Sequence, residues 1–465
     1  MVSRNDARSA RFALLTSVDA ARIQFKNKVN LLFIRLVRRN AFWKLLPTLW
    51  ISTFFMSRIF SPLVLVGLVL AEWYGLQAIR TLVHATSPSG RRLATILYIL
   101  ITLGIWVLGI WGMMSRRDLH ASYKSYFGGL LLAMIAAQLL IALPMLLEDV
   151  VRLGRFVVRL FAPANSATAG RPINRSTFIS QLALLLGAIP FLGLLWGMFK
   201  GGTDYQVKRV TLRFPNLPAS FDGFKIAQIS DLHTGSFQSK EPLRRAVSII
   251  NNQNADLVFM TGDLVNNYAQ EVEEHIDTLA GIKSKLPIFS ILGNHDYSDY
   301  VQWESLEAKR ANLERLKQNH AKIGWRLMLD ESHTLERNGE RIAVIGVQNW
   351  GTKFTKYGNL AKAHATSGDA PFKILLSHDP THWDAQVRDY PDIDLTLSGH
   401  THGAQFGINL PFMKWSPVQY VYDQWAGLYQ KGKQYLYVNV GLGFLGYPGR
   451  VGFLPEITLF ELRRA

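Results

Sequence analysis

The stretch FKIAQISDLHTG, residues 224–235, starts as an apolar run and ends in two polar residues that can bind a metal. Asp231 and His233 are two positions apart, so in an extended strand their side chains point to the same face. The pattern of an apolar run followed at once by polar residues recurs at four later places. These are GD at 262–263, GNHD at 293–296, SHD at 377–379 and GHTH at 399–402.

The apolar runs predict strands, and several are apolar throughout, which is typical of buried strands in a mixed α/β fold. The expected strands are 224–230, 255–261, 287–292, 341–347, 372–377, 393–398, 434–440 and 456–462. Two amphipathic stretches, 241–252 and 303–323, predict helices. Because sites in open α/β sheets form at the carboxyl ends of strands, we expect the polar motifs to meet there.

The polar residues of the motifs offer carboxylate, imidazole and amide ligands. They are Asp231, His233, Asp263, Asn294, His378, His400 and His402. This mixture of nitrogen and oxygen donors suits manganese, iron or zinc better than calcium or magnesium. Seven residues exceed the needs of one ion, and a shared carboxylate could hold two divalent ions about 3.5–4 Å apart. The chain has no cysteine, which excludes thiolate ligands and a cysteine nucleophile.

Each motif alone has an ordinary structural explanation, such as a turn or a histidine packed in the core. Together, in the order DxH, GD, GNHD, H and GHTH over about 207–462, they resemble the calcineurin-like metallophosphoesterase superfamily. The runs NLPASFDGFKIAQISDLHTGSF and GLGFLGYPGRVGFLPEITLFEL are similar to its YkuE/YaeI-type branch. With apolar spans ahead of the motifs, the chain is also similar to transmembrane metallophosphoesterases.

The resemblance implies a four-layer α/β/β/α sandwich with two divalent metal ions. It implies that Asp231, His233 and His402 bind one ion, and that Asp263 bridges to the second. The remaining ligands of the second ion would be Asn294, His378 and His400. The implied reaction is hydrolysis of a phosphoester or pyrophosphate bond by a metal-bridging hydroxide.

The resemblance also implies that His295 acts near the leaving group and is oriented by Asp296. Two positions depart from the family pattern. Ala404 stands where a glycine is usual in GHTHGGQ, and Asp379 stands where asparagine is common. Neither departure removes a metal ligand, so we expect an intact metal site, and any effect would fall on the substrate pocket.

Two stretches rich in aromatic residues, 406–429 and 444–455, follow the GHTH motif and a late strand. One interpretation is ordinary packing of long loops against the sheet. The other is an apolar rim beside the metals for a lipid phosphate, with Arg450 binding the phosphate. The sequence leaves both open.

The first part of the chain contains segments long enough to span a bilayer, which takes about 20 apolar residues. Segments 93–114, 126–147 and 177–199 carry no charged residue, and 59–79 carries only Glu72. We expect about four spans in 59–199 and a phosphoesterase domain in 204–465. Glu72 lies near an interface or, as its spacing favours, inside the helix bundle.

Residues 1–58 are basic and partly apolar, which predicts an amphipathic helix on a membrane surface, with a solvated tail as the alternative. Segment 45–57 is an interfacial hairpin or an extra crossing. Residues 1–200 hold 23 Lys and Arg against 6 Asp and Glu, so the whole net charge of +17 lies there. Positive charge beside apolar spans suits anionic lipids, and we expect no nucleic-acid partner.

Other functions remain open at this stage. A metal-binding membrane scaffold would have no need of His295, and a transporter would need more ionisable residues in its spans than Glu72. A phosphodiesterase or nuclease acting on a soluble substrate would profit from a basic catalytic half, whereas residues 201–465 are neutral overall. The substrate and the oligomeric state do not follow from the sequence.

The basic residues of the short loops predict the orientation of the chain. The first and third loops between the expected spans carry eight Lys and Arg, and the second carries three. The positive-inside rule predicts a multi-pass protein of the cell (plasma or inner) membrane with its catalytic half outside the cytoplasm. The basic N-terminal tail opposes this orientation unless 45–57 also crosses the membrane.

Reporter fusions test this orientation. Alkaline phosphatase fused to the C-terminus should be active and a cytoplasm-only fluorescent reporter dark. The reverse pattern would show that the tail sets the orientation.

Overall fold

The computed structural model describes residues 62–114, 121–161 and 175–465. The expected amphipathic segment 1–58, including the question of 45–57, lies outside the described residues.

Four helices in the first part of the chain are long and apolar enough to cross a membrane. They are α4 (Pro62–Leu82), α5 (Pro88–Met114), α6 (Ala121–Phe161) and α7 (Arg175–Phe199). Each contains one of the four expected spans or most of it. Glu72 lies at a helix–helix contact, because its carboxylate accepts hydrogen bonds from Trp106 Nε1 at 2.9 Å and from the Tyr98 hydroxyl at 3.0 Å. This agrees with the expected position inside the bundle.

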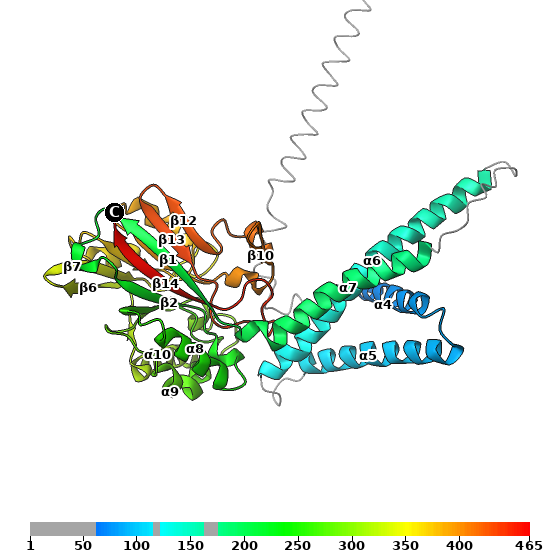
Figure 1. The fold of residues 1–465 in the computed structure, drawn as a ribbon. Helices are drawn as coiled ribbons and strands as arrows, with labels where there is room; N and C mark the ends of the chain where they lie inside the picture. The colour runs from blue at the N-terminus through cyan, green and yellow to red at the C-terminus, as the bar shows by residue number, and fades with distance from the viewer. Residues whose placement is uncertain (1–61, 115–120, 162–174) are drawn as a thin grey trace, which may run out of the picture. The chain divides into compact units, whose positions relative to one another are not determined.

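The first sheet has six strands in the order β1-β14-β2-β3-β4-β5. Figure 1 labels β1, β14 and β2 of this sheet. Strands β2, β3 and β4 run parallel, so their carboxyl ends share one edge. Helices α8 (Glu241–Asn251) and α10 (Leu306–Ile323) pack on one face through a core that includes Leu243 and Leu316. The strands are β1 (Gln206–Phe214), β2 (Lys225–Ile229), β3 (Leu257–Met260), β4 (Phe289–Ser290), β5 (Arg326–Leu327) and β14 (Glu456–Arg464).

The second sheet has six strands in the order β12-β13-β9-β8-β7-β6. Strands β7, β8 and β9 run parallel. Short helices α11 (Leu360–Ala365) and α12 (Thr381–Ala385) pack on one face, with the buried Leu360 and Trp383 in their core. The strands are β6 (Glu331–Arg337), β7 (Glu340–Gly346), β8 (Lys373–Leu376), β9 (Leu395–Ser398), β12 (Gly427–Lys431) and β13 (Gln434–Val438).

The two sheets face each other across an apolar core to which both contribute. Phe259 and Phe460 of the first sheet and Ile374 and Leu397 of the second are fully buried in it. Each sheet has helices on its other face, so the layers are α/β/β/α, as expected. All eight expected strands and both expected helices are present, with ends that shift by a few residues. A small hairpin, β10 (Ile408–Leu410) and β11 (Met413–Trp415), stands apart from both sheets.

The connection from the membrane helices to the first sheet is short. Helix α7 ends at Phe199, a single turn of 3-10 helix follows at Gly201–Thr203, and β1 begins at Gln206. Six residues therefore separate the two elements, and even a fully extended chain of six residues spans at most about 20 Å.

Candidate metal centre

The backbone at the strand ends is unusual. Asp231, His233, Asp263, His400 and His402 all have left-handed φ angles, between 47° and 76°. This conformation costs a residue other than glycine on the order of 1–3 kcal/mol and persists where the surrounding structure enforces it. Five of the seven expected ligands adopt it, so the chain turns sharply after β2, β3 and β9 and aims these side chains at one place.

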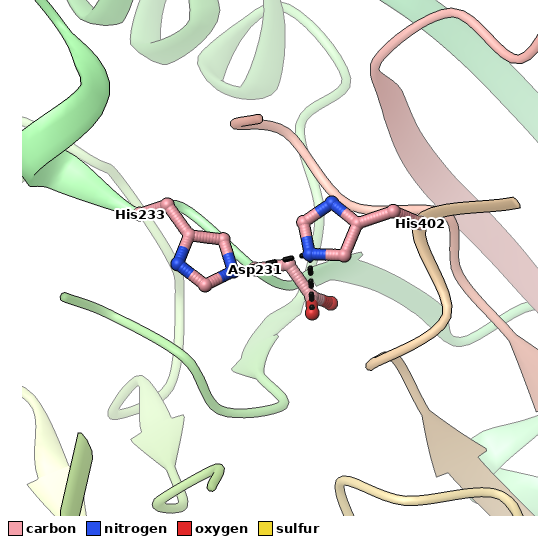
Figure 2. A group of neighbouring side chains, drawn as sticks. All are labelled: Asp231, His233 and His402. Carbon is pink, nitrogen blue, oxygen red and sulfur yellow. Dashed lines mark hydrogen bonds and ion pairs between the residues drawn. The ribbon is translucent and has the colours of Figure 1, made fainter. Parts of the chain in front are cut away.

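A first group consists of Asp231, His233 and His402, all of them buried (Figure 2). The Nε2 atoms of the two histidines face each other at 3.0 Å, and His402 Nε2 is 3.2 Å from Asp231 Oδ1. One ligand atom from each residue lies within 4.8 Å of the others. Two imidazole nitrogens and a carboxylate oxygen converging in this way fit the ligand set of a divalent transition metal.

A second group consists of Asp263, His378 and His400. The Asn294 side-chain oxygen joins it, 2.8 Å from His400 Nδ1 and 3.2 Å from His378 Nε2. The second group therefore offers two nitrogens, a carboxylate and an amide oxygen. The structure brings all seven expected ligands into these two groups, while their binding of metal stays a prediction.

One carboxylate oxygen faces both groups. Asp263 Oδ2 is 3.1 Å from His378 Nε2 in the second group and 3.7 Å from His233 Nε2 in the first. Burial by itself would raise the pKa of Asp263, but the charges of His378 and His295 hold it well below its usual range. Burial alone would lower the pKa of His378, but the negative charge of Asp263 outweighs this effect and raises that pKa to about 10. The carboxylate thus stays ionised between the histidines of the two groups.

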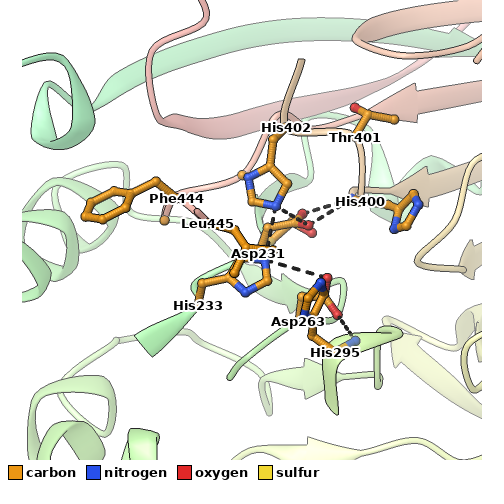
Figure 3. Close-up of polar contacts among 12 residues, drawn as sticks. Asp231, His233, Asp263, His295, His400, Thr401, His402, Phe444 and Leu445 are labelled. Carbon is orange, nitrogen blue, oxygen red and sulfur yellow. Dashed lines mark hydrogen bonds and ion pairs between the residues drawn. The ribbon is translucent and has the colours of Figure 1, made fainter. Parts of the chain in front are cut away.

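Figure 3 shows how the backbone ties the groups together. The backbone N–H of His400 donates to both oxygens of Asp231, at 3.0 and 3.1 Å. The backbone N–H of His295 donates to Asp263 Oδ1 at 2.9 Å. Each carboxylate is therefore fixed by an amide of another motif, which defines its direction before any ion binds.

His295 is buried beside the first group. Its Nδ1 lies 2.8 Å from the Asn266 carbonyl oxygen, so Nδ1 carries the proton and donates it. Its ring lies edge to face with that of His233, with centroids 5.0 Å apart. Burial lowers the pKa of His295. The remaining nitrogen, Nε2, is the one that can exchange a proton with a substrate.

The resemblance implied that Asp296 orients His295, but the side chain of Asp296 is engaged by backbone groups instead. Its carboxylate accepts backbone N–H groups of Asp263 at 2.9 Å, Leu264 at 2.9 Å and Gly293 at 2.8 Å. Burial and the neighbouring Asp263 charge raise the pKa of Asp296 to about 7. Asp296 therefore shapes the turn that carries Asp263, and the Asn266 carbonyl holds His295. No side-chain pattern in the sequence marks a backbone carbonyl for this role.

Arg450 also differs from expectation. It is fully buried, and its Nε and Nη2 donate to the Gly443 carbonyl at 2.9 and 2.5 Å. Its Nη1 donates to the His402 carbonyl at 3.3 Å, and Nη2 is 3.1 Å from His402 Nδ1. The guanidinium therefore contacts His402 on the side of the ring away from Nε2. Burial lowers the pKa of Arg450 to about 10. These contacts support His402, an expected ligand, and are not those of a phosphate-binding group.

Two tyrosines outside the five motifs border the second group. The Tyr422 hydroxyl is 2.9 Å from His400 Nε2, and the Tyr300 hydroxyl accepts from the Asn294 amide at 2.7 Å. Because His400 Nε2 is engaged by Tyr422, its Nδ1 is the nitrogen that faces the group. Tyr422 lies in the aromatic stretch 406–429, whereas nothing in the sequence distinguishes Tyr300.

The two aromatic stretches behave differently. In 406–429 the hairpin side chains Phe412 and Trp415 are 84% and 39% exposed, as an apolar rim requires. In 444–455 Phe444 is 5% exposed and packs in the core with Phe237. The packing interpretation therefore holds for Phe444, and the hairpin stays a candidate rim.

Comparison with known proteins matches both halves of the chain. Residues 33–202 match a family model described as the transmembrane domain of a probable calcineurin-like phosphoesterase, and residues 224–404 match the calcineurin-like phosphoesterase family. YkuE, an uncharacterised metallophosphoesterase of Bacillus subtilis, is 33% identical over 264 residues, or 54% of this chain and 84% of that protein.

Two other relatives have informative names. A Danio rerio transmembrane protein with a metallophosphoesterase domain is 28% identical over 323 residues, 68% of each chain. The UDP-2,3-diacylglucosamine pyrophosphatase LpxG of Chlamydia muridarum is 25% identical over 320 residues, 59% of this chain and 94% of that protein. The motifs, the layered fold and these matches agree, and the chain belongs to the calcineurin-like metallophosphoesterase family, with a transmembrane region ahead of its phosphoesterase domain.

Proposed function

We propose that this membrane metallophosphoesterase is a dinuclear phosphohydrolase whose two ions are held by the two ligand groups around Asp263. The observation that carries the proposal is the single Asp263 oxygen that faces a histidine of each group, at 3.1 and 3.7 Å. When bound, manganese, iron or zinc ions would acidify a water molecule and neutralise charge on the phosphoryl oxygens. Asp231, His233 and His402 would hold one ion, and the residues of the second group the other.

The chain's own residues supply the proton chemistry. With Nδ1 of His295 committed to the Asn266 carbonyl, the imidazolium form would give its Nε2 proton to the leaving oxygen as the bond from phosphorus to that oxygen breaks, and the ring would become neutral, the form that burial favours. Asp296 keeps the turn at Asp263 rigid through four backbone hydrogen bonds. The reaction needs no covalent bond to the protein.

The substrate that fits best is a lipid-linked phosphate or pyrophosphate. Hairpin β10–β11 begins three residues after the expected ligand-bearing turn at His402–Gln405 and exposes apolar side chains at its tip, above all Phe412. A lipid is concentrated at the membrane that the chain itself occupies, which a soluble substrate is not. The relative LpxG is named for an acylated pyrophosphate, which supports the same substrate class.

The proposal includes the organisation of the chain and its orientation. It assigns 59–199 to the membrane and 204–465 to catalysis, supported by the family matches to 33–202 and 224–404. The excess of basic residues in the first and third loops supports a catalytic half outside the cytoplasm.

Removal of Asp263 tests the shared ligand. Asp263→Ala should lose both bound metal and activity, because the carboxylate faces both groups. Metal content by mass spectrometry and p-nitrophenyl phosphate hydrolysis with Mn²⁺ measure the two effects. Asp277→Ala, at an exposed position of the same half, is the control and should match the wild type. Two tightly bound ions with full turnover in Asp263→Ala would rule out the dinuclear assignment.

Removal of His295 tests the proton donor. His295→Ala should keep both ions while kcat for an alkyl phosphate falls by about 10²–10⁴, the usual effect of losing a general acid. The loss should be smaller with p-nitrophenyl phosphate, whose leaving group needs less protonation. His333→Ala, a histidine on β6, should behave like the wild type. An unchanged kcat for the alkyl phosphate would contradict the assignment.

Substitutions in the hairpin test the substrate class. Phe412→Ser and Trp415→Ser should raise KM for a lipid phosphate about tenfold, the scale expected for losing one buried apolar side chain, with little effect on p-nitrophenyl phosphate. Leu428→Ser removes an apolar residue from β12 that is 44% exposed, close to the value for Trp415, and should leave both KM values unchanged. Equal effects on the two substrates would favour a soluble phosphoester and return the hairpin to a structural role.

A further inference from the structure

The loop 444–453 joins two places that are far apart in the sequence, the end of helix α7 and the metal centre. On the helix side, the backbone N–H of Arg450 donates to the Gly197 carbonyl at 3.2 Å. The Tyr447 hydroxyl donates to the carbonyl of Leu194. Both acceptors belong to the last turns of α7, where one side of the helix contacts the loop.

Glycine allows this contact to be close. A Cβ atom added at Gly197 would lie 2.7 Å from Val451 Cγ2, 2.8 Å from the Tyr447 hydroxyl oxygen and 2.9 Å from the Arg450 carbonyl oxygen. Atoms do not approach so closely, so any side chain at Gly197 must move the loop or the helix. One turn earlier, a Cβ at Gly193 would meet no atom within 4 Å.

On the other side, the loop ends at the metal centre through Arg450. This side chain is fully buried, and its donors engage the carbonyls of Gly443, His402 and Phe453. Its Nη2 is 3.1 Å from His402 Nδ1. Groups that contact the far side of a ligand imidazole fix its orientation, and their loss commonly weakens metal binding 10- to 100-fold.

We infer that Arg450 is a positioning residue for His402 and that the end of α7 holds Arg450 in place through the loop. This rests on the proposed metal-binding function of Asp231, His233 and His402. It adds that the affinity of this group for its ion depends on a membrane helix. The backbone N–H of Arg450 contacts Gly197 of the helix, and the guanidinium of the same residue contacts His402. A displacement of the helix end is therefore passed to His402 through Arg450 alone.

The test compares two substitutions on one helix in the full-length, detergent-solubilised protein. Gly197→Leu should weaken the binding of one of two Mn²⁺ ions about 10- to 100-fold, measured as bound Mn²⁺ at defined free concentrations. Gly193→Leu, which meets open space, should bind both ions like the wild type. Activity of Gly197→Leu should recover when Mn²⁺ is raised to saturation, since no residue of the metal centre has changed.

Milder variants keep the inference testable if Gly197→Leu does not fold. Tyr447→Phe removes only the hydroxyl bonded to Leu194 and should weaken Mn²⁺ binding about 2- to 10-fold, as the loss of one hydrogen bond would. Arg450→Met should lower the Mn²⁺ affinity more than Arg450→Lys does, because lysine keeps a positively charged hydrogen-bond donor at this position. A purely structural role would instead lower the unfolding temperature of all three without changing Mn²⁺ affinity in the folded protein.

The outcomes separate the inference from the function on which it rests. If the wild type fails to bind two Mn²⁺ ions, the dinuclear function falls. If the wild type binds two ions and the folded Gly197→Leu, Tyr447→Phe and Arg450→Met variants bind them equally well, the function stands and the link to α7 is overturned.

Discussion

Both sheets converge on one buried cluster of carboxylates and imidazoles, and the arrangement of the molecule around it follows from that requirement. Asp231, His233 and Asp263 follow strands of the first sheet, whereas His378, His400 and His402 follow strands of the second. Each ligand group draws on both sheets. Buried charge is tolerated only when it is paired and hydrogen-bonded. The edges of the two sheets must therefore be aligned so that backbone amides of one motif donate to the carboxylates of another. Ions bound there would hold the sheets together and contribute to folding stability.

The sequence predicted the parts of the structure in which composition and position coincide. Strands such as β2, β3 and β8 are buried on both faces, so their apolar runs stand out. The edge strands β1 and β6 were missed because their polar and apolar residues are mixed, as one exposed face demands. The seven expected ligands meet because parallel strands end at a common edge. The sequence could not show which group orients His295, because a backbone carbonyl has no residue type.

Arg450 and Phe444 show a second limit of sequence reasoning. An arginine near a phosphatase motif suggests phosphate binding, and a phenylalanine in a loop suggests an exposed rim. Whether either points inward depends on how 444–453 packs between α7 and the sheets, which is a tertiary property. The alternative functions also depend on such detail. A metal-binding scaffold would have no use for the free Nε2 of His295 beside the ligand groups. A nucleic acid would be attracted only weakly, because residues 201–465 carry no net charge.

The six residues between α7 and β1 limit the distance between the end of the helix and the catalytic half. Because they span at most about 20 Å and the backbone N–H of Arg450 is bonded to the Gly197 carbonyl of α7, the two groups of expected ligands stay close to the end of that helix. Under the proposed function, hydrolysis of a lipid phosphate would then depend on how far its scissile bond projects from the lipid surface. Two lipids with identical phosphates and different headgroup lengths would be distinguished by height alone, without any contact that reads the headgroup.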